Sequence, residues 1–203
     1  MGNHGKAQTD RELWSRVLDG DGSAFAELFV LHRDRVFGHS LRLVRTPSEA
    51  EDITAMVFLE AWRCRSKVRL VNDSVIGWLL VTTTNVARNR IRSNLRYEQL
   101  IRKLPRAETA PDHGDSVADA VDQDQRSQLL HRAYRSLGRR DQEILALCVI
   151  EEMSTAEVSQ LLRIPPGTVK SRLSRAKQKL AQLLNPQAGL LPAKPLTPEE
   201  GTP

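Results

Sequence analysis

Residues 154–180 read STAEVSQLLRIPPGTVKSRLSRAKQKL, and this stretch decides the fold of the C-terminal half of the chain. Ser154 and Glu157 fit a capping box, in which the serine caps a helix and the glutamate bonds back to the cap amide. That helix is expected to stop near Pro165. Pro166 suits the first turn of a second helix, where its missing amide hydrogen costs nothing. The pattern therefore predicts two helices joined by a tight turn.

The second of these helices has one apolar face and one polar face. At about 100° per residue its apolar side chains share a narrow sector, which must pack on the rest of the domain. These side chains are Val169, Leu173, Ala176 and Leu180. The opposite face carries Ser171, Ser174, Arg175 and Gln178, flanked by Lys170, Arg172, Lys177 and Lys179. A helix in a DNA major groove needs polar side chains toward the base edges and cations beside the phosphates.

The alternative is a basic face that only solvates a terminal helix and complements its dipole. Residues 163–184 contain no acidic side chain, although the whole chain is nearly balanced, with 30 Lys and Arg against 25 Asp and Glu. Together with the capping box and the tight turn, this concentration of positive charge favours helix-turn-helix DNA binding.

The rest of the composition excludes several other classes of protein. No apolar run approaches the roughly 20 residues that cross a bilayer, and the N-terminus lacks the apolar core of a signal peptide. We therefore expect a cytoplasmic protein without membrane insertion. Cys64 and Cys148 show no ligand-type spacing, so we expect two buried thiols, and neither a metal site nor a cofactor.

Helical spacing recurs along nearly the whole chain, which predicts an all-α fold. Helices are expected over residues 24–44, 49–63 and 78–104, with a polar loop at 66–77. Residues 107–125 contain six acidic side chains and neither Lys nor Arg, a composition typical of a linker. The predicted plan is two small helical domains joined by an acidic flexible linker: an N-terminal extension (1–20), a first domain (21–104), the linker (105–125), a second domain (126–184) and a disordered proline-rich tail (185–203).

Two parts of the sequence resemble one family. Residues 137–180, LGRRDQEILALCVIEEMSTAEVSQLLRIPPGTVKSRLSRAKQKL, are similar to the promoter-binding C-terminal domain of bacterial sigma factors. SEAEDITAMVFLEAWR (48–63) and WLLVTTTNVARNRIR (78–92) resemble the N-terminal domain of the extracytoplasmic-function (ECF) sigma factors. Ala55 and Asn89 depart from the pattern, where the family usually has Gln and Asp. The resemblance implies a protein that binds core RNA polymerase, recognises the −35 and −10 promoter elements and promotes DNA melting.

By this resemblance the helix at 49–63 would dock on the clamp helices of the largest polymerase subunit, and the chain would also meet the polymerase flap. The polymerase-binding candidates are Asp52, Glu60 and Arg63. Phe58 and Trp62, four residues apart, are expected to belong to the core. The resemblance also allows an anti-sigma protein as a further partner.

The resemblance divides the DNA contacts between the two domains. The −35 element would be read by Lys170, Ser171, Arg172, Ser174, Arg175, Gln178 and Lys179. The −10 candidates are Asn72, Asn85, Arg88, Arg92 and Arg96, of which the arginines would contact phosphates. Asn85 has two open interpretations, a base contact or an amide bonded within the helix bundle. The acidic linker is either suited to polymerase channels that otherwise hold nucleic acid or a plain soluble tether.

Two other functions fit the sequence less well. A stand-alone regulator would leave the first basic segment unused and would need a ligand-binding or phosphorylation domain. An enzyme is not supported, because His32-Arg33-Asp34 matches only the start of a kinase catalytic loop, without the phosphate-binding glycines or the metal-binding motif.

Overall fold

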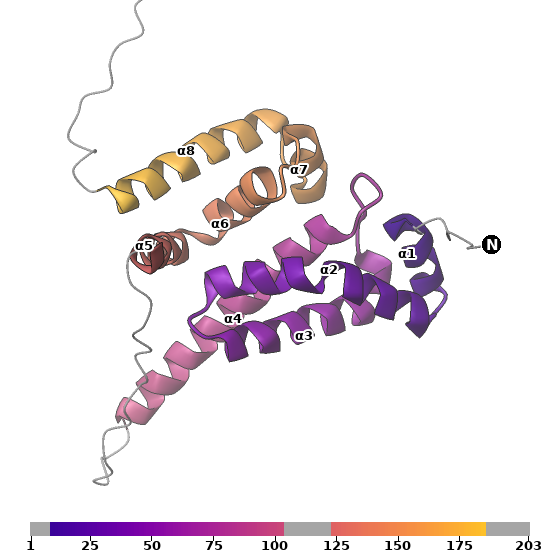
Figure 1. The fold of residues 1–203 in the computed structure, drawn as a ribbon, viewed down its shortest axis with the longest axis horizontal. Helices are drawn as coiled ribbons and strands as arrows, with labels where there is room; N and C mark the ends of the chain where they lie inside the picture. The colour runs from indigo at the N-terminus through magenta and orange to yellow at the C-terminus, as the bar shows by residue number, and fades with distance from the viewer. Residues whose placement is uncertain (1–8, 104–122, 186–203) are drawn as a thin grey trace, which may run out of the picture.

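The structure is a computed structural model that describes residues 9–103 and 123–185, which fold into two helical bundles (Figure 1). The first bundle consists of α1 (Asp10–Leu18), α2 (Gly22–Leu43), α3 (Pro47–Arg63), a 3-10 turn (Arg65–Lys67) and α4 (Ile76–Lys103). The second consists of α5 (Gln123–Ser136), α6 (Arg139–Leu145), a π-helical turn (Ala146–Ile150), α7 (Thr155–Leu162) and α8 (Pro166–Leu184).

The predicted all-α fold is confirmed. Within residues 9–103 and 123–185 the sole exception to helices and loops is one isolated β-bridge, between Val71 and Ser74. None of the described helices is both long and apolar enough to cross a membrane. The linker was predicted over residues 105–125, of which 105–122 lie outside the described residues, as does the proline-rich tail from residue 186. The last three residues of the predicted linker, 123–125, belong to α5 instead.

Three long helices of the first bundle enclose one core. Its fully buried side chains come from α2, α3 and α4 and include Leu28, Val36, Ile53, Val57, Leu79 and Leu80. Phe58 is buried as expected, and its ring lies 4.8 Å, centroid to centroid, from the half-buried Phe29. Trp62 is only half-buried and packs against this core. At about 1.5–3 kcal/mol for each large apolar side chain, such burial holds the bundle together.

The first helix, α1, was not foreseen in the segment 1–20. Thr9 caps α1, and Glu12 completes a capping box with it. Leu13, Trp14 and Val17 are buried, so α1 is an integral part of the first bundle. The threonine and glutamate at capping-box spacing are the signal in the sequence that could have revealed this helix.

The second bundle contains the predicted pair of helices. Ser154 and Glu157 form the capping box that starts α7, and Arg163, in a left-handed conformation, ends it. Pro166 is the first residue of α8. Val169 and Ala176 are fully buried, while the outward positions of α8 are exposed. The predicted tight turn and its buried face are therefore confirmed.

The prediction for the two cysteines was wrong, because both are part-exposed rather than buried. Cys64 ends α3, and its thiol donates a hydrogen bond of 3.1 Å to the carboxylate of Glu60. Cys148 lies in the π-helical turn that follows α6, in which Ala146 and Leu147 are the buried residues. Helical spacing alone does not predict burial where a helix ends or changes its pitch.

The two bundles pack directly against each other, α4 on α6 and α2 on α5 (Figure 1). Arg35 of the first bundle forms an ion pair with Glu151 of the second. His39 of α2 is buried, and its Nε2 atom forms a hydrogen bond of 2.9 Å with the hydroxyl group of Thr84. Its ring lies edge-on to the ring of Tyr134 of α5. Burial lowers the pKa of His39 to about 3, so this ring is neutral in the folded protein.

Gly77, the second residue of α4, is a point of close approach between the bundles. A Cβ atom at Gly77 would lie 2.7 Å from Cδ2 of Leu161 and 3.4 Å from Cε of Met153, both in the second bundle. A Cβ here would force the ends of these two side chains to shift, and a larger side chain would need more room still.

We expect Gly77→Leu to drive the bundles apart without unfolding either one. Overpacking of this kind costs about 1–3 kcal/mol, which favours separated bundles on the order of tenfold or more. The radius of gyration from small-angle X-ray scattering should rise. Gly38→Leu on α2 is the matched control, because the nearest atom there, of Arg42, is 3.8 Å away. An unchanged radius in a folded Gly77→Leu protein would contradict the packing described here.

Candidate nucleic-acid interface

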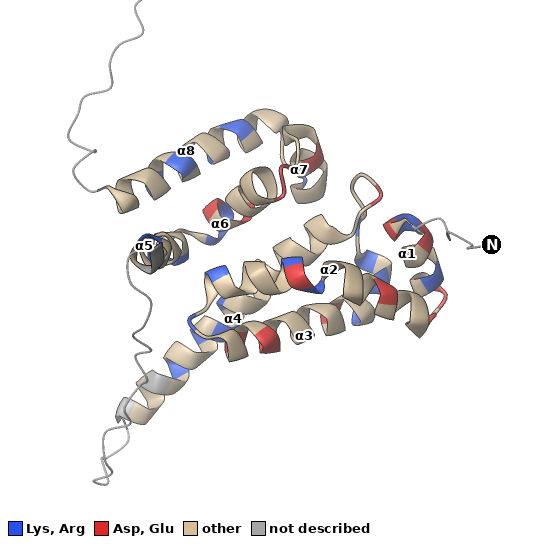
Figure 2. Ribbon diagram, in the orientation of Figure 1, with Lys and Arg blue, Asp and Glu red and all other residues tan. Residues whose placement is uncertain are grey.

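A cleft of about 690 Å³ is lined by residues of α4, α6 and α8. Its charged lining residues are Arg88, Arg92, Arg139, Arg140, Arg172, Arg175, Lys179 and a single acid, Asp141. Figure 2 shows Lys and Arg positions along both α4 and α8. We call this space the basic cleft. Its lining brings together candidates for both predicted DNA contacts, which the sequence had assigned to separate domains.

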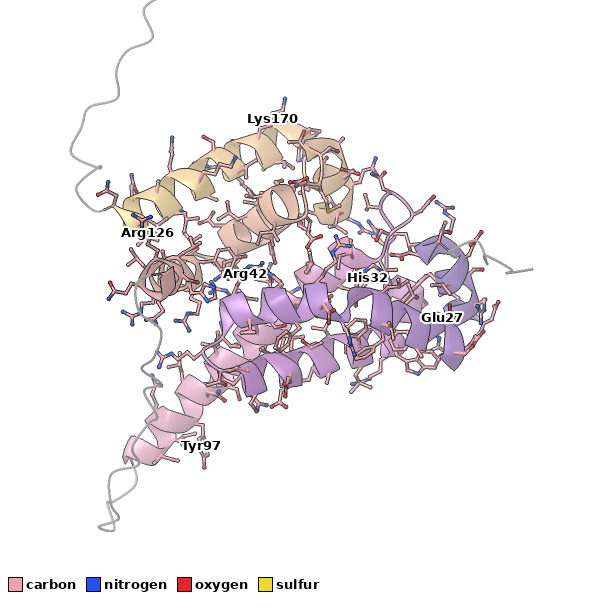
Figure 3. The ribbon with its side chains drawn as sticks, viewed as in Figure 1. Glu27, His32, Arg42, Tyr97, Arg126 and Lys170 are labelled. Atoms are coloured by element: carbon pink, nitrogen blue, oxygen red, sulfur yellow. The ribbon has the colours of Figure 1, made fainter. Side chains whose placement is uncertain are left out.

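The α8 side of the basic cleft continues onto an exposed polar face. Ser171, Ser174, Arg175 and Gln178 are all exposed, as predicted, and Lys170 projects away from the molecule (Figure 3). The Nε atom of Arg175 donates a hydrogen bond of 3.2 Å to the backbone carbonyl of Ser171, so the side chain lies along its own helix. This face is therefore open to a macromolecule that approaches from outside.

Two flanking cations of α8 are less free than the sequence indicated. The ammonium group of Lys179 lies 2.6 Å from the carboxylate of Asp141, which offsets part of its charge. Arg172 is half-buried in the wall of the basic cleft. The partner of Lys179 is on α6, so no pattern within α8 could have revealed it.

Two side chains on the α4 side of the basic cleft form hydrogen bonds with the second bundle. Oδ1 of Asn85 accepts a hydrogen bond of 2.8 Å from Arg139. Arg88 donates a hydrogen bond of 3.1 Å to the side-chain amide oxygen of Gln142 and another to the backbone carbonyl of Leu137. The amide of Asn85 is therefore bonded to the other bundle rather than within its own, and its contact with a base stays a prediction.

Electrostatics works against this packing. Burial lowers the pKa of Arg88, and the positive charges of Arg92 and Arg139 lower it further. Glu143 acts in the opposite direction, but burial raises the pKa of that carboxyl group. Several cations thus face one another across the basic cleft with few acids between them, an arrangement that a polyanion would stabilise.

The remaining −10 candidates are solvent-accessible. Arg92 and Arg96 are exposed on α4, the helix whose C-terminal part extends beyond the bundle and carries Tyr97 (Figure 3). Asn72 is exposed at the tip of a tight turn between Val71 and Ser74. These side chains are available for contact in the packed arrangement, unlike Asn85 and Arg88.

The outer face of α3 forms a second candidate surface. Asp52 and Arg63 are exposed, and Asp52 lies 3.5 Å from Arg90. Glu60 is half-buried and accepts the hydrogen bond from the thiol of Cys64. Sequence reasoning missed the apolar part of this face, Met56 at 44% and Leu59 at 58% exposure. Their positions, out of phase with the buried residues of α3, were the signal.

Comparisons with known proteins agree with this division of the chain. Residues 28–97 match the family model described as Sigma-70 region 2, and residues 127–180 match Sigma-70, region 4. The RNA polymerase sigma factor CarQ of Myxococcus xanthus is 31% identical over 83% of this chain and 94% of its own length. The ECF RNA polymerase sigma factor SigW of Bacillus subtilis (strain 168) is 27% identical over 83% of this chain and 93% of its own.

Two solved structures share the fold. CnrH, in complex with the cytosolic domain of CnrY, is 21% identical, with 88% of this chain and 99% of that chain covered and a TM-score of 0.59. The sigma factor RpoE from Bartonella quintana, in complex with the anti-sigma factor NepR, is 21% identical, with 79% and 96% covered and a TM-score of 0.54. At this identity the likeness extends to the fold alone.

Proposed function

The chain belongs to the ECF sigma factors of bacterial RNA polymerase, and from this membership we propose which of its side chains bind promoter DNA and which bind the polymerase. It is a non-catalytic factor that binds core RNA polymerase and promoter DNA and directs promoter-specific transcription initiation. Because both of these partners are in the bacterial cytoplasm, we place its action there.

The −35 element is bound by α8. The observation that carries this assignment is the pair of opposite faces on one helix, with Val169 and Ala176 fully buried and the polar side chains exposed. Seven residues make up the reading face and its flanks: Lys170, Ser171, Arg172, Ser174, Arg175, Gln178 and Lys179. Arg175 is the long outward cation among them, and it can bond a guanine edge through two nitrogens.

The −10 element is bound by α4 and by the turn before it. Asn85 faces the basic cleft and can hydrogen-bond an unstacked base, while Arg88, Arg92 and Arg96 contact phosphates of the opened strands. Asn72 adds a second amide at the tip of the turn. Melting needs a site for an unpaired base and cations for the displaced strand, and this region offers both.

Reading both elements requires the two bundles to separate. The −35 and −10 positions are about 25 base pairs apart, which is about 85 Å of duplex. In the packed structure the two reading faces line a single cleft. Residues 104–122, which connect α4 to α5, number 19 and reach at most about 65 Å, and the helices on either side add to that reach. Separation would release Asn85 from Arg139 and Arg88 from Gln142.

The polymerase is bound by the outer face of α3, through Asp52, Glu60 and Arg63 together with the apolar pair Met56 and Leu59. These apolar side chains are about half exposed, and their burial against a partner would stabilise a complex. The surrounding charges then select a partner of complementary charge.

Arg175→Ala should abolish discrimination among −35 sequences, because the lost bidentate contact is worth about 1–3 kcal/mol. Lys179→Ala is the comparison, and it should weaken binding evenly across sequences because it removes a flanking charge. The measurement is a binding series over −35 variants with holoenzyme. Unchanged discrimination in the Arg175 variant would exclude it as the base-reading residue.

Asn85→Ala should leave the closed promoter complex nearly intact and impair its opening. Duplex affinity comes mainly from phosphate contacts and α8, whereas the amide acts only on an unpaired base. Permanganate footprinting reports opening, and a template with a mismatched bubble at −10 should restore transcription. Asn89→Ala, a neighbouring exposed asparagine, should open normally. Normal opening by Asn85→Ala, or failure of the bubble to rescue it, would contradict the assignment.

Leu59→Asp should weaken holoenzyme formation by about 1.5–3 kcal/mol, the value of burying one leucine. The matched control is Val30→Asp on α2, which places a charge at a side chain that is 65% exposed. Titration of fluorescent core polymerase measures both affinities, and binding of each variant to duplex −35 DNA checks the second bundle. Equal loss in both variants would argue against α3 as the docking surface.

A further inference from the structure

The turn that carries Asn72 is too small to hold its own shape. It consists of residues 71–74, closed by two reciprocal backbone hydrogen bonds of 3.1 Å between Val71 and Ser74. Asn72 and Asp73 have φ values of +49° and +58°, in the left-handed region. Tight turns of this kind favour glycine at the second of these positions, and this chain has an aspartate there. An isolated bridge of this size is marginal in water, so other contacts must fix it.

Those contacts come from α1. Oδ2 of Asp10, the first residue of α1, accepts a hydrogen bond of 2.7 Å from the Ser74 hydroxyl and one of 3.1 Å from the amide of Val75. The same oxygen lies 2.8 Å from Nε2 of His32 on α2. The side chains of Asp10 and His32 are only 14% and 6% exposed, so these charge-assisted bonds are sheltered from water.

The same carboxylate also acts on the start of α4. Ser74 bonds Asp10 through its hydroxyl, and the oxygen of that hydroxyl lies 3.3 Å from the amide of Ile76, the first residue of α4. Arg11, next to Asp10, forms an ion pair with Asp73 at the tip of the turn. Figure 1 shows the loop before α4 rising beside α1. The turn is thus tied to α1 at its tip and at its base.

We propose that Asp10 is a positioning residue for −10 recognition, which fixes the 71–74 turn and thereby the place where Asn72 meets the promoter. The inference rests on the proposed role of Asn72. It assigns to α1, which precedes the segment matched by the region 2 family model, a share in promoter specificity. Asp10 itself touches no DNA in this scheme.

The fold of α1 does not depend on this carboxylate. Leu13, Trp14 and Val17 bury the inner face of the helix, and Thr9 with Glu12 caps its first turn. Loss of Asp10 should therefore free the turn and leave the bundle folded. This separation makes a functional test meaningful, because a merely structural residue would affect all promoters alike.

The test uses full-length protein assembled into holoenzyme, with Asp10→Asn, Ser74→Ala and, as the matched control, Asp19→Asn at the exposed end of α1. Transcription from a series of −10 variants and a series of −35 variants gives two discrimination ratios for each protein. Asp10→Asn should lower the −10 ratio on the order of tenfold and leave the −35 ratio unchanged. Hydrogen exchange of residues 71–75 should become faster, and Ser74→Ala should act in the same direction.

Asn72→Ala, measured in the same series, separates the two claims. If Asn72→Ala lowers the −10 ratio and Asp10→Asn and Ser74→Ala do not, the positioning role of Asp10 is overturned while the proposed function stands. If Asn72→Ala itself leaves the −10 ratio unchanged, the role of the turn in recognition is overturned, and the inference with it. A fall in both the −10 and −35 ratios in Asp10→Asn and Ser74→Ala would show a general structural defect instead and would also overturn it.

Discussion

The half-buried guanidinium group of Arg88 joins the two bundles and determines how the chain is arranged. Its bonds to Gln142 and to the carbonyl of Leu137, with the adjoining bond from Arg139 to Asn85, bring α4 against α6. Once these helices meet, the α4 and α8 faces that we assign to DNA binding line one basic cleft. The same contacts that make the free chain compact therefore use side chains that the proposed −10 contact needs.

This packing is held by directional bonds against electrostatic repulsion. Arg92 and Arg139 both act to lower the pKa of Arg88, because each disfavours another positive charge nearby. In the proposed complex, promoter phosphates would offset this repulsion, because they favour the cations of the basic cleft once the bundles part. Promoter binding as proposed is therefore an exchange, in which bonds between the bundles are replaced by bonds to DNA.

The parts of the structure that depend on neighbouring residues could be predicted, and the parts that depend on distant ones could not. The capping box at Ser154, the start of α8 at Pro166 and the buried face through Val169 all follow from spacing within a few residues. The hydrogen bond between Asn85 and Arg139 joins residues 54 positions apart, and no pattern within either helix predicts that the other lies beside it. The 71–74 turn lacks the glycine that usually marks such a turn, so its shape emerges only from the contacts with Asp10.

The most direct test of the central claim is the distance between the bundles, before and after promoter binding. Cys64 and Cys148 are first replaced by serine, and spin labels are attached at Ala26→Cys on α2 and Gln182→Cys on α8, both exposed positions. Pulsed electron paramagnetic resonance then measures the distance between the two labels. We predict one well-defined distance in the free chain and a distance longer by tens of ångströms in holoenzyme on promoter DNA, because the two elements are about 85 Å apart. An unchanged distance in a complex that transcribes would contradict this prediction.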